Sequence, residues 1–252
     1  MIERKCYRIT LTAVEPLHLG SKDDPISDAE NQVAVVGDRL CIPGPSLKGA
    51  YRHNLERWLF ATFFAGEHWQ DQSLMPCLAN TRASREENLL VDKRRYRRGM
   101  CSLTRDSAPI CPVCYALGGM GVLGFVRVPF LFAPVDDTRE ALYSARIDRA
   151  TGTVAPRANR SYQIVPLDVQ FQGELEITLR DPFLEWEFGK KRRFHEGADI
   201  DRWLDAAPVR QWDRDRFLKE LVIDRLQSID RLGGYRSKGC GKVSIRLEPT
   251  ES

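Results

Sequence analysis

The stretch IPGPSLKG at residues 42–49 marks the passage from a strand into a helix. Pro43 and Pro45 cannot continue a central strand, because proline has no backbone N–H to give to a sheet. Ser46 is a preferred N-cap residue. Apolar side chains then recur with the spacing of one helical face: Leu47, Tyr51, Leu55, Trp58 and Leu59. We therefore predict a helix from about Leu47 to Phe64.

Strand patterns flank this helix on both sides. Upstream, residues 2–14 alternate apolar and polar side chains, and residues 33–42 form a short hairpin around Gly37 and Asp38. Downstream, three strands and a second helix follow at residues 122–133, 168–180 (with a kink at Gly173), 213–232 (the helix) and 243–247. This order predicts an α+β domain with helices on one face of an antiparallel sheet, and a ferredoxin-like arrangement is the natural candidate.

The composition allows one substantial core, or one core that carries a large insertion, since 42% of the 252 residues are hydrophobic. The net charge is only +3, so any RNA contact has to come from local clusters of basic residues. The sequence has no run of about 20 apolar residues, the length that crosses a bilayer, and no export signal. We expect a cytoplasmic protein without a membrane partner.

The helix start at residues 44–49 has the features of an anion site. Small residues let a ligand approach the backbone, and the first turn of a helix leaves N–H groups unpaired. Lys48 and Arg52 add positive charge one turn apart. We predict that Ser46, Lys48 and Arg52 contact phosphate. The alternative is an ordinary turn with solvated basic residues.

A second basic motif, GGYRSKGCGK, occupies residues 233–242. Its four glycines exceed what the C-terminal cap of a helix requires. The glycines alternate with Arg236, Lys238 and Lys242, and this pattern predicts a loop that follows a phosphate backbone. The alternative is a flexible turn before the last strand.

The cysteines favour metal binding over disulfides, because their number, seven, is odd and their spacing is irregular. Cys111 and Cys114 have the two-residue spacing with which two thiolates reach one tetrahedral zinc ion, and Cys77 and Cys101 lie in the same segment without periodicity. We predict a structural zinc site made by these four cysteines in an insertion over residues 66–120, where the metal supplies folding energy. His68 is a substitute ligand, and free thiols are the alternative. The basic run at residues 93–98 either contacts RNA or forms a solvated face.

Several motifs together resemble one family. The stretches at residues 42–49 and 234–243 resemble the helix-start motif and the C-terminal glycine-rich loop of the RAMP proteins. IDRATGT at residues 147–153, followed by QIVP at 163–166, looks like the thumb of the Cas-seven backbone subunits of type III CRISPR effector complexes, the Csm-three and Cmr-four kind. PLHLG at residues 16–20 is also similar, so the resemblance covers most of a single domain over residues 1–252.

This resemblance implies a modified ferredoxin-like (RRM-like) palm and a thumb-like hairpin over residues 145–166 that carries Arg149. It implies that the protein holds a guide CRISPR RNA (crRNA) by its backbone while base pairing captures target RNA. Other Cas-seven-like subunits and further subunits of the effector complex would be its partners. Zinc-binding insertions occur in some Cas-seven relatives, notably fused type III effectors.

The resemblance also raises the question of cleavage. In the family, an aspartate in the loop after the first strand assists metal-dependent cleavage of target RNA, for which Mg²⁺ is the expected ion. Counting back from Pro43 favours Asp28, whereas aligning Val33 with the apolar residue that follows the catalytic position favours Glu30. Two alternatives stay open. One is a non-cleaving structural subunit of the same complex, and the other is a crRNA-processing endonuclease that uses His18 or His53 as general base.

Overall fold

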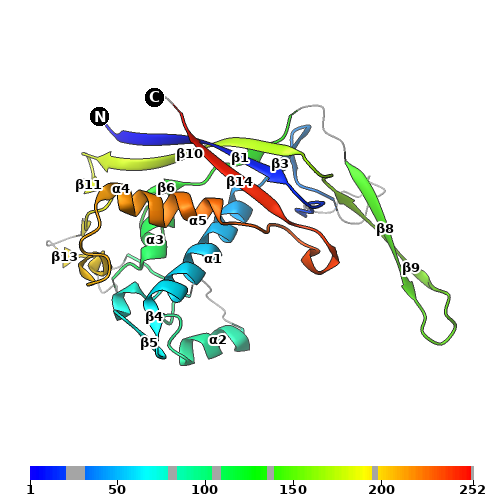
Figure 1. Ribbon diagram of the computed structural model, residues 1–252, viewed down its shortest axis with the longest axis horizontal. Helices are drawn as coiled ribbons and strands as arrows, with labels where there is room; N and C mark the ends of the chain where they lie inside the picture. Colours follow the sequence, from blue (N-terminus) through cyan, green and yellow to red (C-terminus); the bar gives the residue numbers. More distant parts are fainter. Residues whose placement is uncertain (21–31, 79–83, 104–108, 135–138, 195–197, 251–252) are drawn as a thin grey trace.

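A six-strand path of antiparallel pairs forms the centre of the computed structural model, which describes residues 1–20, 32–78, 84–103, 109–134, 139–194 and 198–250. In sheet order the strands are β14 (Val243–Pro249), β1 (Glu3–Ala13), β10 (Gln170–Asp181), β7 (Leu131–Phe132), β3 (Arg39–Ile42) and β2 (Val35–Val36). Two further strands, β6 (Val126–Arg127) and β11 (Trp186–Glu187), also pair with β10. Figure 1 shows helices lying along one face of this sheet, so the predicted α+β class is confirmed.

Two long helical elements cover that face. The first is α1 (Gly44–Phe63), and the second is a continuous C-terminal helix made of α4 (Arg214–Phe217), the π-helical η4 (Leu218–Ile223) and α5 (Asp224–Gln227). The buried face of α1 contains the apolar residues that the sequence pattern selects, apart from the half-buried Trp58. The Tyr51 hydroxyl on this face donates to the carbonyl of Leu221 in η4 at 2.7 Å, which joins the two helices.

The start of α1 differs from the prediction. The helix begins at Gly44 with Pro43 as N-cap, so Ser46 lies inside the first turn and is not the cap. Pro45 fits there because the N–H groups of a first turn have no partner within the helix. A Cβ on Gly44 would lie 3.1 Å from the carbonyl oxygen of Pro129, which explains the small residue at this position.

Two strand predictions also change. The strand expected over residues 122–133 is broken into β6 and β7, because Pro129 between them cannot donate to a ladder. Gly173 does not kink β10, since the pairing with β1 continues through it opposite Ile9. Instead, a Cβ at Gly173 would lie 2.6 Å from the carbonyl oxygen of Phe130, so the glycine allows a close approach of two backbones.

The remaining elements lie outside the sheet. Strands β8 (Glu140–Ile147) and β9 (Val154–Ile164) form a long hairpin that projects from the domain (Figure 1). The others are β4 (Phe64–Ala65), β5 (His68–Trp69), η1 (Gln72–Leu74), α2 (Arg85–Asp92), α3 (Pro112–Leu117), β12 (Arg193–Phe194), β13 (Ala198–Asp199), η3 (Arg202–Asp205) and η5 (Arg236–Lys238). In the part of the chain that the structure describes, no helix is long and apolar enough to cross a membrane.

The segment predicted as an insertion contributes to the core at both ends, and Trp69, Leu74 and Met75 are its buried residues at the first end. All six residues of α3 are buried, and its apolar side chains join the main hydrophobic cluster. By contrast, none of the described residues 84–100 is buried. The part that lacks a core of its own is therefore shorter than the predicted range of 66–120.

A buried ion pair fixes the region beside α3. Arg192 and Asp201 are both fully buried, and the Nε and Nη2 atoms of Arg192 donate to the carboxylate of Asp201 at 2.7 and 2.8 Å. The guanidinium also lies within 5.2 Å of the ring centres of Tyr115, Phe125 and Trp186. The charge of Arg192 is thus satisfied entirely inside the protein.

We expect Asp201→Asn to lower the free energy of unfolding by about 3 to 5 kcal/mol, because it leaves a buried guanidinium without its counter-charge. Urea unfolding followed by circular dichroism measures this loss. The matched control is Asp92→Asn, which breaks the exposed pair with Arg98 and leaves stability nearly unchanged, since both of its side chains are more than half exposed. Equal stability of the two variants would contradict the role assigned to the buried pair.

Candidate metal centre and nucleic-acid interface

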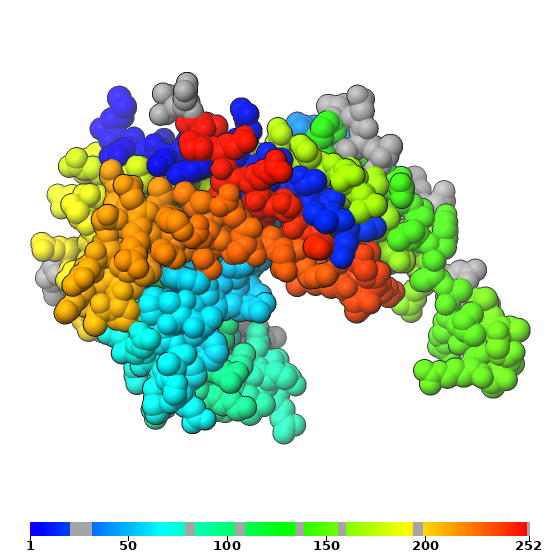
Figure 2. All heavy atoms as spheres, viewed as in Figure 1, coloured from blue at the N-terminus to red at the C-terminus, as the bar shows by residue number. Residues whose placement is uncertain are grey.

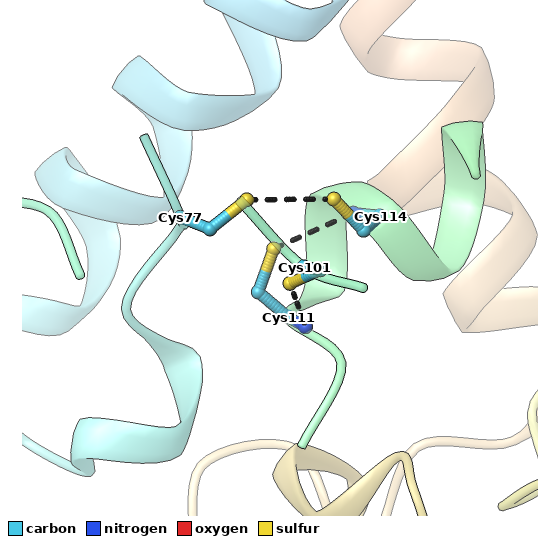
Figure 3. A group of neighbouring side chains, drawn as sticks. All are labelled: Cys77, Cys101, Cys111 and Cys114. Carbon is cyan, nitrogen blue, oxygen red and sulfur yellow. Dashed lines mark hydrogen bonds between the residues drawn. The ribbon is translucent and has the colours of Figure 1, made fainter. Parts of the chain in front are cut away.

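Four cysteines converge at one point beside α1 and α3. The Sγ atoms of Cys77, Cys101, Cys111 and Cys114 all lie within 4.8 Å of one another, and all four residues are buried (Figure 3). A zinc ion with four Zn–S bonds of about 2.3 Å places its sulfurs about 3.8 Å apart. The Sγ atoms of Cys77 and Cys114 are 3.5 Å apart, close to that spacing. The cluster therefore has the composition and the size of a tetrahedral metal site that suits an ion such as zinc.

Local structure brings the ligands together. Cys111 is the N-cap of α3, and its Sγ accepts a hydrogen bond from the backbone N–H of Cys114, one turn later, at 3.5 Å. Cys101 Sγ accepts from the backbone N–H of Cys111 at 3.3 Å. Cys77 is held by a parallel bridge to Arg97. The predicted substitute ligand, His68, is exposed in β5 and is not part of the cluster.

Two arginines supply positive charge to the sulfurs. Arg97 Nη2 lies 2.7 Å from Cys101 Sγ, while Arg52 Nη2 and Nη1 lie 3.4 and 3.8 Å from the Sγ atoms of Cys77 and Cys114. Four thiolates around a divalent ion carry two net negative charges, which two guanidinium groups offset. Such donors to the ligand atoms are what a metal centre with thiolate ligands needs.

The contact with the sulfurs of Cys77 and Cys114 gives Arg52 a role other than the predicted contact with phosphate. Its Nε lies 2.8 Å from Glu56 Oε1, and its side chain is only 19% exposed. Burial raises the pKa of Glu56 to about 7, and the nearby charge of Arg52 acts in the opposite direction. Arg52 therefore connects α1 to the cysteine cluster instead of facing solvent at the helix start.

The two glycine motifs meet at a cleft of about 1130 Å³. Ser46 and Gly49 line it from α1, and Gly233 and Arg236 line it from the C-terminal loop, so segments far apart in the sequence form one surface. Figure 2 shows the molecule hollowed between the cyan α1, the teal residues around α2 and the orange-red C-terminal loop.

Positive charge predominates in this cleft. Its arginines are Arg57, Arg95, Arg225, Arg231 and Arg236, against the acidic Glu56 and Asp230. The pKa of His53, which also lines the cleft, is lowered by burial and by the charges of Arg57 and Arg236. A concave surface with excess arginine attracts polyanions.

The glycines of the C-terminal loop have separate causes. Gly233 has φ +84°, and a Cβ there would collide with the carbonyl oxygen of His18. Gly241 has φ +98°, and its Cβ would lie 2.7 Å from the carbonyl oxygen of Leu232. Packing of the chain therefore requires these two glycines, whereas no described atom lies within 4 Å of a Cβ placed on Gly239. The high glycine content of this loop is therefore explained in part by packing, at Gly233 and Gly241, and only in part by exposed positions such as Gly239.

An aromatic group lies between this loop and the base of the β8–β9 hairpin. The ring of His18 is packed 4.7 Å from that of Tyr235, and its Nδ1 is 2.7 Å from the carbonyl oxygen of Gln163. Lys238 Nζ lies 4.9 and 5.6 Å from the ring centres of Tyr235 and Tyr162. His18 is thus a buried packing residue, and Lys238 joins the C-terminal loop to the hairpin base at Tyr162.

The tip of the hairpin is a defined turn. Asp148 Oδ1 accepts the backbone N–H groups of Thr151 and Ala150 at 3.0 and 2.8 Å, and these hydrogen bonds hold the pKa of Asp148 below its ordinary value. Arg149 is exposed in this turn. Lys48 and Lys242 are exposed on α1 and at the end of the C-terminal loop. Asp28 and Glu30 lie outside the described residues.

Sequence reasoning missed several residues of the cleft. Arg57, Arg95, Arg225 and Tyr96 line it together, although they come from three separate segments. Arg95 and Tyr96 belong to the basic run at residues 93–98, for which RNA contact was one of the two sequence predictions, whereas no signal in the sequence pointed to Arg57 or Arg225.

A comparison with known families finds one match, in which the model described as the RAMP superfamily covers residues 10–244. No curated protein matches the chain.

We expect elemental analysis of the purified protein to find one bound metal ion per chain, because the four buried sulfurs form a closed site. The double substitution Cys111→Ser, Cys114→Ser should abolish this metal. Cys240→Ser is the matched control, since Cys240 is also buried but lies outside the cluster. Full metal content in the double variant would refute the site.

Proposed function

This chain belongs to the RAMP superfamily, and we propose that it is a guide-RNA-binding backbone subunit of a type III CRISPR interference complex. One observation carries the proposal: the helix-start motif and the C-terminal glycine-rich loop line the same arginine-rich cleft. The partners would be crRNA, target RNA, other Cas-seven-like subunits and further subunits of the complex.

The topology supports a ferredoxin-like palm. Along the chain β1, α1, β6 with β7, β10, the C-terminal helix and β14 follow one another in the order β-α-β-β-α-β. Within the sheet β14, β1, β10 and β7 are neighbours. The projecting β8–β9 hairpin would be the thumb, with Arg149 at its tip.

The cleft suits a phosphate backbone. Gly49 is a helical glycine that costs about 0.5 to 1 kcal/mol relative to alanine. No described atom lies within 4 Å of a Cβ placed on it, so packing does not require it. An RNA backbone could approach α1 closely there, beside Ser46 and Arg236. Contacts by Lys48, Lys238 and Lys242 would extend this surface toward the thumb, while base pairing with the guide reads the target.

Two metals enter the proposal with different roles. Zinc in the cysteine cluster would be structural, because four protein ligands leave no open position for a substrate. Mg²⁺ would take part only in cleavage, at Asp28 or Glu30 in the acidic loop. A subunit that holds RNA without cutting it would use the same cleft. In the endonuclease alternative His53, exposed in the cleft, would be the better base, because His18 is packed under Tyr235.

We expect the affinity for single-stranded RNA to fall steeply with salt, by a slope of about 0.7 in log–log units for each phosphate contact. Arg236→Ala should weaken binding about tenfold and lower that slope. Fluorescence anisotropy with labelled RNA at several salt concentrations measures both. Arg210→Ala, an exposed arginine outside the cleft, is the control and should bind normally. An affinity that does not depend on salt would refute contacts with the phosphate backbone.

For cleavage, the complex assembled with a guide RNA, a labelled complementary target and Mg²⁺ should give products at regular spacing. We expect Asp28→Ala to abolish the products and to leave target binding intact, because it removes a metal ligand and not an RNA contact. If products persist in Asp28→Ala but not in Glu30→Ala, the second residue is the catalytic one. Products that survive both substitutions exclude this loop, and bound but uncut target in the unmodified complex identifies a non-cleaving subunit.

A further inference from the structure

The cleft has a second wall that neither glycine motif supplies. Arg95 and Tyr96, in the segment between Cys77 and Cys101, line it from this side. The guanidinium of Arg95 lies 5.2 Å from the ring centre of Phe60, and the hydroxyl of Tyr96 donates to Glu56 Oε2 at 3.2 Å. We call this segment the basic wall (residues 84–100). It contacts α1 through Arg95 and Tyr96, and both residues also line the cleft.

The basic wall is attached to the cysteine cluster. Arg97 follows Tyr96 directly, and its Nη2 donates to Cys101 Sγ at 2.7 Å. The backbone of Arg97 accepts from Leu78 at 3.0 Å and donates to Pro76 at 2.9 Å, on either side of Cys77. The cluster therefore holds the wall at the residue next to those that line the cleft.

The opposite side of the cleft is attached to the same cluster. Arg52 of α1 donates to the sulfurs of Cys77 and Cys114 and pairs with Glu56, which in turn accepts from Tyr96. One group of four sulfurs thus contacts both the wall and the helix that faces it.

The basic wall has no core of its own. Beyond the cluster, Trp69 Nε1 donates to the carbonyl of Arg94 at 2.8 Å, and Arg97 Nη1 donates to that of Pro109 at 2.6 Å. None of its residues is buried, and α2 within it buries no side chain. A segment without a core of its own depends on its anchor points for a fixed shape. These anchors are the cysteine cluster, which the wall reaches through Arg97, and the contacts that Arg94, Arg95 and Tyr96 make with neighbouring residues.

Three arginines in this half of the cleft have no direct salt-bridge partner among the described residues, although the acidic Asp224 and Glu220 lie near Arg225. Arg57, Arg95 and Arg225 make no ion pair with any acidic residue that the structure describes. Arg225 lies 5.0 Å from the ring centre of Trp58, as Arg95 lies over Phe60, so both guanidinium groups rest on aromatic rings. Arginines arranged in this way in a cleft are suited to a phosphodiester backbone.

We propose that Arg57, Arg95 and Arg225 form a second RNA-backbone contact whose shape is set by the metal-loaded cysteine cluster, so that loss of the metal weakens RNA binding. This inference rests on the proposed function, since it places more of the RNA in the same cleft. It assigns to the metal a role in ligand affinity in addition to its role in folding.

The first test measures the affinity of the full chain for a labelled single-stranded oligouridylate. We expect the double substitution Arg57→Ala, Arg95→Ala to weaken binding about tenfold or more and to reduce the salt slope. The matched control is Arg85→Ala, Arg98→Ala, which removes two exposed arginines of the basic wall that do not line the cleft. If the two double variants bind equally, the second contact does not exist.

The outcomes separate this inference from the proposed function. Normal binding by Arg57→Ala, Arg95→Ala together with weak binding by Arg236→Ala overturns the second contact and leaves the proposed function standing. If the unmodified protein does not bind RNA at all, the proposed function fails and the inference fails with it.

The second test removes the metal with a chelator while circular dichroism monitors the sheet and helices. We expect the metal-free protein to bind RNA as weakly as the Arg57→Ala, Arg95→Ala variant, and the same treatment to have little further effect on that variant, because both changes act on one contact. An equal loss of affinity in both proteins would show that the metal acts through the whole fold, and an unchanged affinity in the unmodified protein would show that it does not act on RNA binding. Either result would overturn the coupling. If the chelator unfolds the protein, a role in the whole fold is shown and the coupling is likewise rejected.

Discussion

Residues 16–18, just after β1, are held by backbone hydrogen bonds from two sides, and the geometry of the cleft depends on this clamp. On one side the N–H of Gly234 donates to the carbonyl of His18 at 2.8 Å. On the other, Leu17 and Val165 exchange two hydrogen bonds of 2.9 and 2.8 Å. The end of the first strand, the C-terminal loop and the base of the hairpin therefore move as one unit. Only glycine fits at position 233, where the two backbones come closest.

The cysteine cluster performs a comparable task on the opposite side of the cleft by different chemistry. Apolar burial stabilises the sheet and α1, whereas residues 84–100 have no buried side chain. Arg97 attaches these residues to the sulfur ligands instead. Arg52 and Arg97 carry the positive charge that such a centre needs. Each is also connected to a residue that lines the cleft, Arg52 to Glu56 by an ion pair and Arg97 to Tyr96 by the chain. Neighbouring arginines therefore have different tasks: Arg97 compensates the charge of the sulfurs, and Arg95 presents its charge to a ligand in the cleft.

The elements with strict periodicity could be predicted from the sequence. Alternation identified β1, β10 and β14, and helical spacing identified α1. The four cysteines predicted to share one metal, from the two-residue spacing of Cys111 and Cys114 and the presence of two more in the same segment, do lie together. The break at Pro129 has a local cause that the predicted strand over residues 122–133 ignored, the missing N–H of proline. The other failures depended on contacts between distant segments: the approach of two backbones at Gly173 and the partners of Arg52. A basic side chain looks the same in a sequence whether it meets solvent, a thiolate or a carboxylate. Arg57 and Arg225 were overlooked for that reason, whereas Arg236 was predicted to contact RNA. Only the fold brings these arginines together in one cleft.

Strand β14 forms one edge of the sheet. Among the described strands β14 pairs with β1 alone, and Val243 at its start also donates to the carbonyl of Asp230 at 2.9 Å. The exposed side chains along it include Arg246 and Glu248, and Pro249 lacks an N–H to offer. Charges and proline on an edge strand oppose the addition of a further strand and so limit aggregation. Copies of this chain are thereby discouraged from fusing their sheets, which leaves assembly to surfaces formed by side chains.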